Sequence, residues 1–180
     1  MKHAVELMPA PTANQPGGYV RRAYAGRDPM TPSLDVEIAR PPGIWRIRLR
    51  WPCPEPVTDM RGDPSVFPDA AALFAPLHEE SNWITMGAPG LGVEGVLWRA
   101  DTERLFAVHA EGVGTMRRSD APAGWRYDAR HAGGFWELDL TLPGWAALDG
   151  AGRFATAVWR GSAGDRGGLK SVSPDWLQAT

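Results

Sequence analysis

The clearest pattern of hydrophobic and polar positions lies in residues 44–51, where the two kinds of residue alternate strictly. Trp45, Ile47, Leu49 and Trp51 share one face, and three arginines occupy the other. This period of two predicts a β-strand with one buried and one exposed face. Three prolines among the next five residues end the pattern.

Other short segments have the same strand character and are separated by turn signals. They are residues 70–74, 93–99, 105–111, 125–130, 134–142 and 154–159. Glycine (21 residues) and proline (17 residues) are frequent, which favours many short strands over long helices. Only residues 142–148 and 174–179 predict helical turns. The chain is therefore predicted to be all-β, an antiparallel β-sandwich of two sheets with a few short helical turns.

The first part of the chain lacks this periodicity. Residues 1–33 are rich in proline and glycine and predict an extended N-terminal arm, whereas residues 34–180 predict one sandwich domain. The start of the arm contains Glu6 and two prolines, which is unlike the apolar segment of a signal peptide. We therefore expect either a cytoplasmic protein or a processed N-terminus.

Charge and cysteine content exclude several classes of protein. The net charge of −2 gives no general attraction to nucleic acid or to anionic membranes. Cys53 is the single cysteine, which excludes an internal disulfide, a cysteine-rich zinc site, an iron–sulfur cluster and covalent c-type haem. No apolar run approaches the roughly 18 residues that are needed to span a bilayer.

Most candidate catalytic or binding residues have a simpler structural explanation. The four histidines lack metal-ligand spacing, and His109 fits better as a half-buried residue of a strand. Glu137 and Asp139 lie opposite the apolar stripe of their segment, so we expect them in solvent rather than as a glycosidase pair. The nine tryptophans leave sugar stacking open, although those in strand-like segments fall on apolar faces.

Met86 and Lys170 carry donor atoms suited to a metal. Of the 19 lysine and arginine residues only Lys2 and Lys170 are lysines, and a buried lysine can become a neutral amine, which arginine cannot. Met86 precedes Gly87, which would let a flat ligand approach closely, and a thioether is a known axial ligand of haem iron. The simpler explanations are a core methionine and a surface amine.

Five short motifs resemble, in the same order, those of one protein family. They are residues 67–74 (FPDAAALF), 85–87 (TMG), 96–101 (VLWRAD), 110–115 (AEGVGT) and 169–173 (LKSVS). The chain is similar to the haem b subunit of ethylbenzene dehydrogenase and its relatives, including dimethylsulfide dehydrogenase. These are the gamma subunits of the type II molybdoenzymes of the dimethyl-sulfoxide-reductase family. The similarity covers residues 34–178, although the chain is short for the family and shows no signal peptide.

The resemblance implies a β-sandwich that holds one non-covalent haem b between its sheets, with Met86 and Lys170 as the axial ligands of the iron. It implies a non-catalytic electron-transfer subunit of a periplasmic oxidoreductase complex. In the family, a molybdopterin-containing alpha subunit and an iron–sulfur beta subunit complete a heterotrimer. The haem relays electrons between the iron–sulfur clusters and a soluble carrier such as a cytochrome c. The resemblance does not identify which arginines contact the haem propionates or the partner subunits.

Two other functions stay open at this point. One is a non-redox ligand-binding β-sandwich module for a carbohydrate or another small molecule. The other is an interaction subunit that has lost its haem. In every case we expect no nucleic-acid partner and no membrane span.

Overall fold

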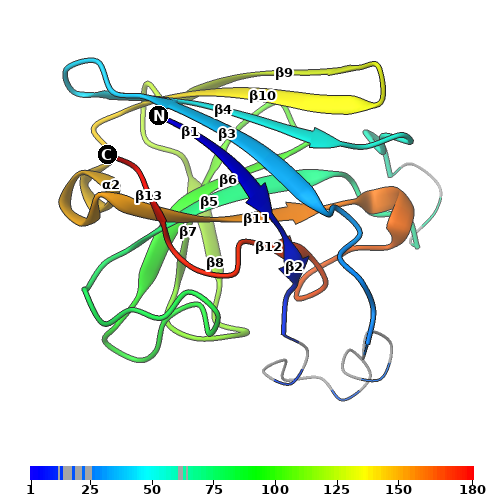
Figure 1. Cartoon of the computed structure of the whole chain (residues 1–180), viewed down its shortest axis with the longest axis horizontal. Helices are drawn as coiled ribbons and strands as arrows, with labels where there is room; N and C mark the ends of the chain where they lie inside the picture. Colours follow the sequence, from blue (N-terminus) through cyan, green and yellow to red (C-terminus); the bar gives the residue numbers. More distant parts are fainter. Residues whose placement is uncertain (12, 14–17, 19–21, 23–25, 61–62, 64) are drawn as a thin grey trace.

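Two antiparallel β-sheets packed face to face form the protein in the computed structural model, which describes residues 1–11, 13, 18, 22, 26–60, 63 and 65–180 (Figure 1). The first sheet has five strands in the order β1-β3-β4-β10-β9. They are β1 (Lys2–Glu6), β3 (Ser33–Ala39), β4 (Ile44–Pro52), β10 (Phe135–Pro143) and β9 (Arg126–Ala132). The prediction of an antiparallel β-sandwich is confirmed.

The second sheet has eight strands, ordered β2-β12-β11-β5-β6-β7-β8, with β13 paired to β11. They are β2 (Met8–Pro9), β12 (Ser171–Val172), β11 (Arg153–Trp159), β5 (Ala70–Pro76), β6 (Val93–Arg99), β7 (Phe106–Ala110), β8 (Arg117–Asp120) and β13 (Leu177–Gln178). The helix α2 (Ala146–Ala151) follows β10, and the 3₁₀ turn η2 (Gly161–Ala163) follows β11. Consecutive strands form the antiparallel pairs β6–β7 and β9–β10.

The helical predictions need correction. The predicted turn at 142–148 is displaced, because β10 continues to Pro143 and the helix covers Ala146–Ala151. The predicted turn at 174–179 is wrong, since β13 pairs with β11 and places Gln178 opposite Arg153. Within the described ranges, no helix is long and apolar enough to cross a membrane.

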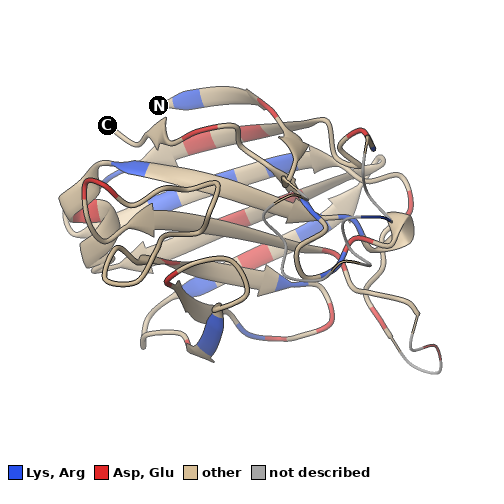
Figure 2. Ribbon diagram, turned by 90° about the horizontal axis from the view of Figure 1, so that it is seen from below, with Lys and Arg blue, Asp and Glu red and all other residues tan. Residues whose placement is uncertain are grey.

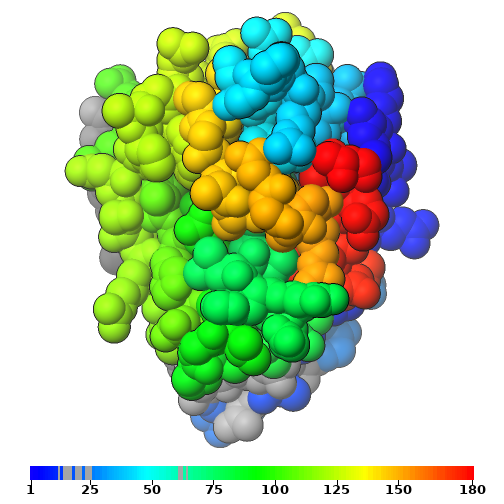
Figure 3. All heavy atoms as spheres, turned by 90° about the vertical axis from the view of Figure 1, so that its left-hand side faces the viewer, coloured from blue at the N-terminus to red at the C-terminus, as the bar shows by residue number. Residues whose placement is uncertain are grey.

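The structure also corrects the prediction of an extended arm over residues 1–33. Strand β1 pairs with β3 along its whole length, and β2 pairs with β12, so the first nine residues add an edge strand to each sheet. Figure 3 shows these N-terminal residues beside the C-terminal ones, and His3 Nε2 lies 2.8 Å from the carbonyl oxygen of Gln178. Much of the remaining predicted arm lies outside the described residues.

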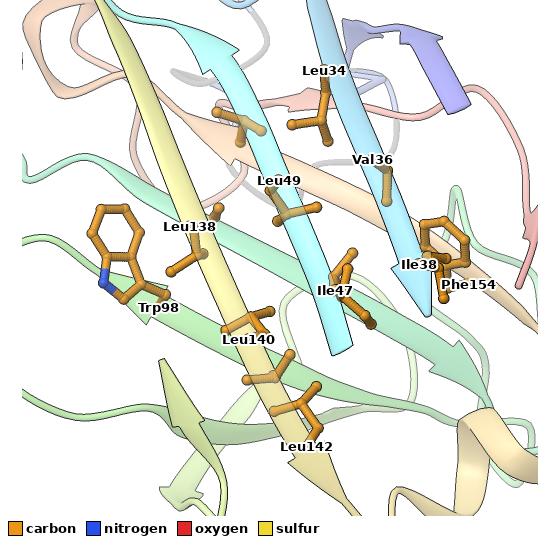
Figure 4. Close-up of a cluster of buried hydrophobic side chains, with 14 of the residues drawn as sticks. Leu34, Val36, Ile38, Ile47, Leu49, Trp98, Leu138, Leu140, Leu142 and Phe154 are labelled. Atoms are coloured by element: carbon orange, nitrogen blue, oxygen red, sulfur yellow. The ribbon is translucent and has the colours of Figure 1, made fainter. Parts of the chain in front are cut away.

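A large apolar core fills the space between the two sheets (Figure 4). Trp45, Leu49 and Leu138 from the five-stranded sheet are each at most 1% exposed. They pack with residues of the opposite sheet such as Leu73 and Trp98. The predicted core tryptophans Trp45 and Trp51 are therefore confirmed, and burial of this size is the main source of stability.

The outer face of the five-stranded sheet is charged, and its charges are paired across strands. Arg48 donates hydrogen bonds to both carboxylate oxygens of Asp139, at 2.7 and 3.0 Å. Glu137 forms ion pairs with Arg130 and Arg50. Figure 2 shows acidic and basic residues interspersed along the strands. The predicted solvent position of Glu137 and Asp139 is confirmed, and each exposed pair contributes about 0–1 kcal/mol.

Asp69, at the start of β5, joins four segments through one buried carboxylate. Its side chain is fully buried. The two carboxylate oxygens accept hydrogen bonds from the backbone N–H of Val57 (2.8 Å), the indole of Trp136 (2.9 Å) and the backbone N–H of Gly161 (2.7 Å). Cys53 Sγ lies 3.4 Å from the same carboxylate, so this buried cysteine belongs to the same set of contacts. Both sheets and two loops therefore meet at Asp69.

We predict that Asp69→Ala destabilises the fold by about 3–5 kcal/mol, because it leaves several buried donors without an acceptor. Urea unfolding at neutral pH measures this loss. Asp128→Ala, at an exposed position of β9, is the matched control and should change stability by less than about 0.5 kcal/mol. Equal effects of the two substitutions would contradict the structural role of Asp69.

Candidate functional site

The central strands β11, β5 and β6 of the eight-stranded sheet are buried on both faces, and their outer face holds the candidate site. In β5, every second residue faces the core between the sheets, beginning with Ala71. The alternate residues Ala70, Ala72 and Phe74 belong to a second apolar cluster on the opposite face. Met86 belongs to this second cluster. A strand that is covered on both sides reads as a continuous apolar run, as β5 does.

Met86 is presented by a tight loop between β5 and β6. It is the only non-glycine residue in the described chain with a left-handed backbone (φ 55°), and Gly87 follows with φ 83°. The left-handed backbone costs about 1–2 kcal/mol at Met86 and little at Gly87, because glycine has no Cβ atom. The loop is held by hydrogen bonds from Met86 N to the Trp83 carbonyl (2.8 Å) and from Gly112 N to the Met86 carbonyl (2.9 Å). These contacts stabilise a strained backbone that directs the thioether onto the sheet.

Gly87 cannot be replaced without a rearrangement of this loop. A Cβ atom at this position would lie 2.5 Å from the carbonyl oxygen of Leu91 and 3.2 Å from the Cα of Gly92. Gly87 was expected to let a flat ligand approach closely, and in the structure its close neighbours are the backbone atoms of Leu91 and Gly92. Its role in the structure is to close the Met86 loop.

Lys170 lies between a tight turn and strand β12. Arg166 and Leu169 exchange two backbone hydrogen bonds (3.0 and 2.8 Å), and the carbonyl of Lys170 accepts one from Ala10 N (2.9 Å). The segment is also tied to the Met86 loop, because the Trp83 indole donates to the Ser173 carbonyl at 2.8 Å. The two predicted site residues are thus held by connected backbone segments.

The structure brings Met86 and Lys170 together. The Nζ atom of Lys170 lies 3.4 Å from the Sδ atom of Met86, although the two residues are 84 positions apart. Met86 is 8% exposed and Lys170 is 9% exposed. The amine also lies 5.0 Å from the centroid of the Trp159 ring. The simpler explanation of Lys170 as a surface amine is therefore wrong.

Burial lowers the pKa of Lys170 from its usual value of 10.5 to about 8. Desolvation disfavours the charged ammonium, and among the described residues no carboxylate forms an ion pair with it. The Met86 thioether is a weak hydrogen-bond acceptor and compensates little for the lost water. Burial therefore makes loss of the proton easier, and above about pH 8 the pair consists of a neutral amine beside a thioether, two uncharged donors for a soft or borderline metal.

A cavity of about 480 Å³ opens on the same face of the sheet. Its apolar wall includes Ala70, Leu97 and Trp159, all members of the second cluster. The Trp159 ring also lies beside the Lys170 amine, so this side chain neighbours both the cavity and the donor pair. Along β11, the small residues Ala155 and Ala157 precede Trp159 on the same face.

This placement corrects the expectation that the ligand lies between the two sheets. The core between the sheets contains neither Met86 nor Lys170 and is filled by large side chains. Both candidate ligands lie instead on the outer face of the eight-stranded sheet, under the loops that precede β6 and β12. Met86 and Lys170 were predicted as a pair from the resemblance, whereas their position on this face was not.

The other sequence candidates do not join this site. His109 is exposed on β7, and His131 Nε2 lies 2.7 Å from the carbonyl oxygen of Cys53. Sequence reasoning missed Trp159 as a neighbour of the donor pair, and it missed Asp165, which lines the cavity. Burial raises the pKa of Asp165 from 3.8 to about 6. Neither residue stands in a motif that would have identified it.

Comparisons with known proteins give a similarity of fold alone. No protein-family model matches the chain, and no curated protein matches it. A solved structure of a carbohydrate binding module family 9 (CBM9) from Caldicellulosiruptor kristjanssonii, in complex with glucose, is similar with a TM-score of 0.45. It is 6% identical in sequence, and the similarity covers 93% of this chain and 73% of that chain.

These findings correct the sequence-based characterisation of the chain as a metal-binding protein with haem, iron and oxidoreductase character. In the described part of the chain, no group of three or more His, Cys, Asp or Glu side chains could hold a metal ion. Of that characterisation, the β-sandwich is confirmed and the remainder has no support from these findings. Methionine and lysine are not among the four residue types, so the function of their contact is a separate question.

We predict that Lys170 makes the stability of the cofactor-free protein depend on pH. Its pKa is about 8 when folded and 10.5 as the ordinary value, so between these pH values the unfolded chain binds a proton that the folded chain lacks. Stability attributable to this group therefore rises with pH from 8 to 10.5, by up to about 3 kcal/mol. Below pH 8 the burial cost is present in full.

Urea unfolding of the wild type and Lys170→Leu at pH 7, 8, 9 and 10 measures this dependence. The variant should be the more stable protein at pH 7, and its advantage should shrink as the pH rises. Lys2→Gln, at an exposed lysine that pairs with Glu37, serves as the control and should show no such trend. A difference between wild type and Lys170→Leu that is constant with pH would contradict a neutral buried amine.

Proposed function

We propose that the chain is a haem b-binding electron-transfer subunit in which Met86 and Lys170 are the axial ligands. The observation that supports this function is the buried contact of 3.4 Å between the thioether and the amine. A neutral thioether and a neutral amine that meet in an apolar site form a poor hydrogen bond and a good pair of metal donors. The proposal rests on these two residues and on the resemblance of the sequence motifs.

The donor pair fits a metal centre with a small adjustment. A metal ion held by both donors would need Met86 Sδ and Lys170 Nζ to lie farther apart than the observed 3.4 Å, because each donor would bond the metal instead of contacting the other donor. Methionine and lysine side chains are long and flexible, so rotamer changes can supply this movement without a shift of the sheet.

The protonation state of Lys170 also fits. A lysine binds a metal ion only as the neutral amine, and a site that already lowers the pKa to about 8 reduces the cost of losing the proton. The positive charge of a metal ion would lower that pKa further. An arginine at this position could not be deprotonated, which agrees with the retention of a lysine in a chain whose other basic residues, apart from Lys2, are arginines.

The surroundings fit a flat apolar group. The sheet beneath the donor pair presents small side chains, among them Ala72, Ala155 and Ala157. The adjoining cavity of about 480 Å³ has an apolar wall that includes Trp159. Bound haem would supply a one-electron redox centre, and thioether ligation favours a high reduction potential. The role of this chain would be to bind that group, to exclude water from it and to position it for electron transfer.

The proposed subunit would work with the partners that the resemblance implies. A molybdopterin-containing alpha subunit would carry out the reaction, and an iron–sulfur beta subunit would exchange electrons with the haem. A soluble carrier such as a cytochrome c would complete the relay. A periplasmic location belongs to the same proposal.

We predict that the purified protein binds haem in a 1:1 ratio and gives a low-spin visible spectrum in the reduced state. Met86→Leu and Lys170→Leu should each lose the low-spin bands and bind haem at least about tenfold more weakly, about 1.4 kcal/mol. Lys2→Leu removes the other lysine of the chain, which is exposed on β1 of the five-stranded sheet, and is the matched control. Absorbance titration with haem and circular dichroism of each variant provide the measurements.

Two outcomes would count against this function. A wild-type protein that takes up no haem would refute it directly. Haem uptake with the same spectrum in wild type, Met86→Leu and Lys170→Leu would refute the two axial ligands.

A second candidate is a non-redox module for a carbohydrate or another small molecule. The cavity favours it, because Trp159 and Phe67 offer aromatic surfaces near arginine side chains. In this case calorimetry should detect binding of a soluble oligosaccharide. That binding should be unchanged in Met86→Leu and Lys170→Leu, which separates the two functions.

A further inference from the structure

We infer that the cavity of about 480 Å³ beside Trp159 receives the carboxylate-bearing edge of the ligand, and that Arg118 and Arg166 bind its carboxylates. The ligand class is thus an apolar macrocycle or other flat body that carries carboxylates on one side. For the identity of the ligand this inference rests on the proposed function. It adds the orientation of the ligand and two specific arginines.

The lining of the cavity is apolar on the sheet side and basic toward solvent. Ala70, Leu97 and Trp159 form part of the buried wall, and Arg99, Arg118 and Arg166 are the basic residues of the lining. Such an arrangement suits a molecule whose body is apolar and whose charged groups remain at the surface.

The three arginines are not equivalent. Arg99 donates two hydrogen bonds to the carboxylate of Asp101, at 3.0 and 2.7 Å, so its charge is already neutralised. Among the described residues, neither Arg118 nor Arg166 forms an ion pair with a carboxylate. These two guanidinium groups are therefore available to an incoming anion.

Aromatic rings hold both available arginines near the cavity. The Arg166 guanidinium lies 5.0 Å from the centroid of the Phe67 ring, and that of Arg118 lies 5.5 Å from the Phe106 ring. Arg166 also donates to the carbonyl of Gly164 at 3.0 Å. A guanidinium that rests on a ring keeps its donors free for bidentate contact with a carboxylate.

Asp165 is the one carboxylate that belongs to the lining. It is buried, and its Oδ2 accepts a hydrogen bond from the backbone N–H of Arg160 at 3.1 Å. With Arg99 neutralised by Asp101, the remaining lining carries two guanidinium charges against this one carboxylate. The balance favours an anionic ligand.

The path from the cavity to the donor pair runs past Trp159. Its ring lines the cavity and lies 5.0 Å from the Lys170 amine. A flat ligand that lies against the Trp159 ring and reaches the donor pair would have Arg118 and Arg166 at the edge that faces this cavity. Carboxylates on that edge of the ligand would need no burial.

Metal-free protoporphyrin IX tests this inference, because it keeps both carboxylates and lacks the iron. Its dimethyl ester removes the two negative charges and leaves the ring intact. We predict, from fluorescence titration, that the wild type binds the free acid at least about tenfold more tightly than the ester, and that this preference weakens as salt is added.

The double variant Arg118→Gln/Arg166→Gln should lose the preference, with binding of the free acid weakened about tenfold or more. Arg126→Gln, an exposed arginine on β9 of the other sheet, is the matched control and should bind like the wild type. Circular dichroism confirms that each variant is folded. Equal affinity for acid and ester, an unchanged double variant, or no binding of the free acid by the wild type would each overturn the inference.

The two proposals fail in distinguishable ways. If the low-spin haem spectrum forms but the arginine variants bind both porphyrins like the wild type, the orientation is wrong and the axial ligands stand. If the arginine-dependent preference is present but Met86→Leu and Lys170→Leu leave the haem spectrum unchanged, the axial ligands are wrong and the anion site stands.

Discussion

The burial of the central strands of the eight-stranded sheet on both faces is the constraint on which the rest of this structure depends. One face packs against the five-stranded sheet and forms the main core. The other would expose a broad apolar surface if the loops before β6 and β12 did not cover it. Those loops carry Met86 and Lys170, so the covering that the sheet requires also brings the two donors together. Asp69 couples the two layers, because its carboxylate joins Trp136 of the five-stranded sheet to Gly161 after β11.

The Lys170 amine is the clearest energetic anomaly within this arrangement. Burial without an ionic partner is unfavourable for a lysine, and a leucine would satisfy the apolar surroundings at lower cost. The left-handed backbone of Met86 is a second unfavourable feature within the same contact. Two local costs that meet at one pair of atoms are typical of a functional site. A purely structural explanation would have to account for both separately.

Much of the fold could be predicted from the sequence, because alternation reports directly on a strand with one buried face. The alternation in residues 44–51 predicted β4 and the buried face on which its tryptophans lie. Residues 70–74 were predicted as a strand, but a strand buried on both sides shows no alternation, so its two faces could not be told apart. The pattern therefore could not tell that a second apolar cluster lies on the outer face. The pairing of β1 with β3 and of β13 with β11 depends on contacts between distant segments, which explains why the first residues read as an arm and residues 174–179 as a helical turn.

The candidate site could likewise be predicted only in part from the sequence. Met86 and Lys170 could be identified from the motifs around them, and a lysine among arginines is visible in composition alone. Their neighbours Trp159, Arg118 and Arg166 could not, because each stands in an ordinary strand or loop sequence and gains its meaning from the cavity. The resemblance led us to expect the two donors between the sheets. This expectation failed because the space between the sheets is already filled by Trp45, Trp51 and their neighbours.

The outer-face position of the donor pair bears on the order of assembly. Since the core between the sheets contains neither donor, the sandwich can fold without waiting for a prosthetic group. If the chain binds a prosthetic group as proposed, that group would enter by parting loops rather than by opening the sheets. Its insertion would then be a late event on a scaffold that is already folded.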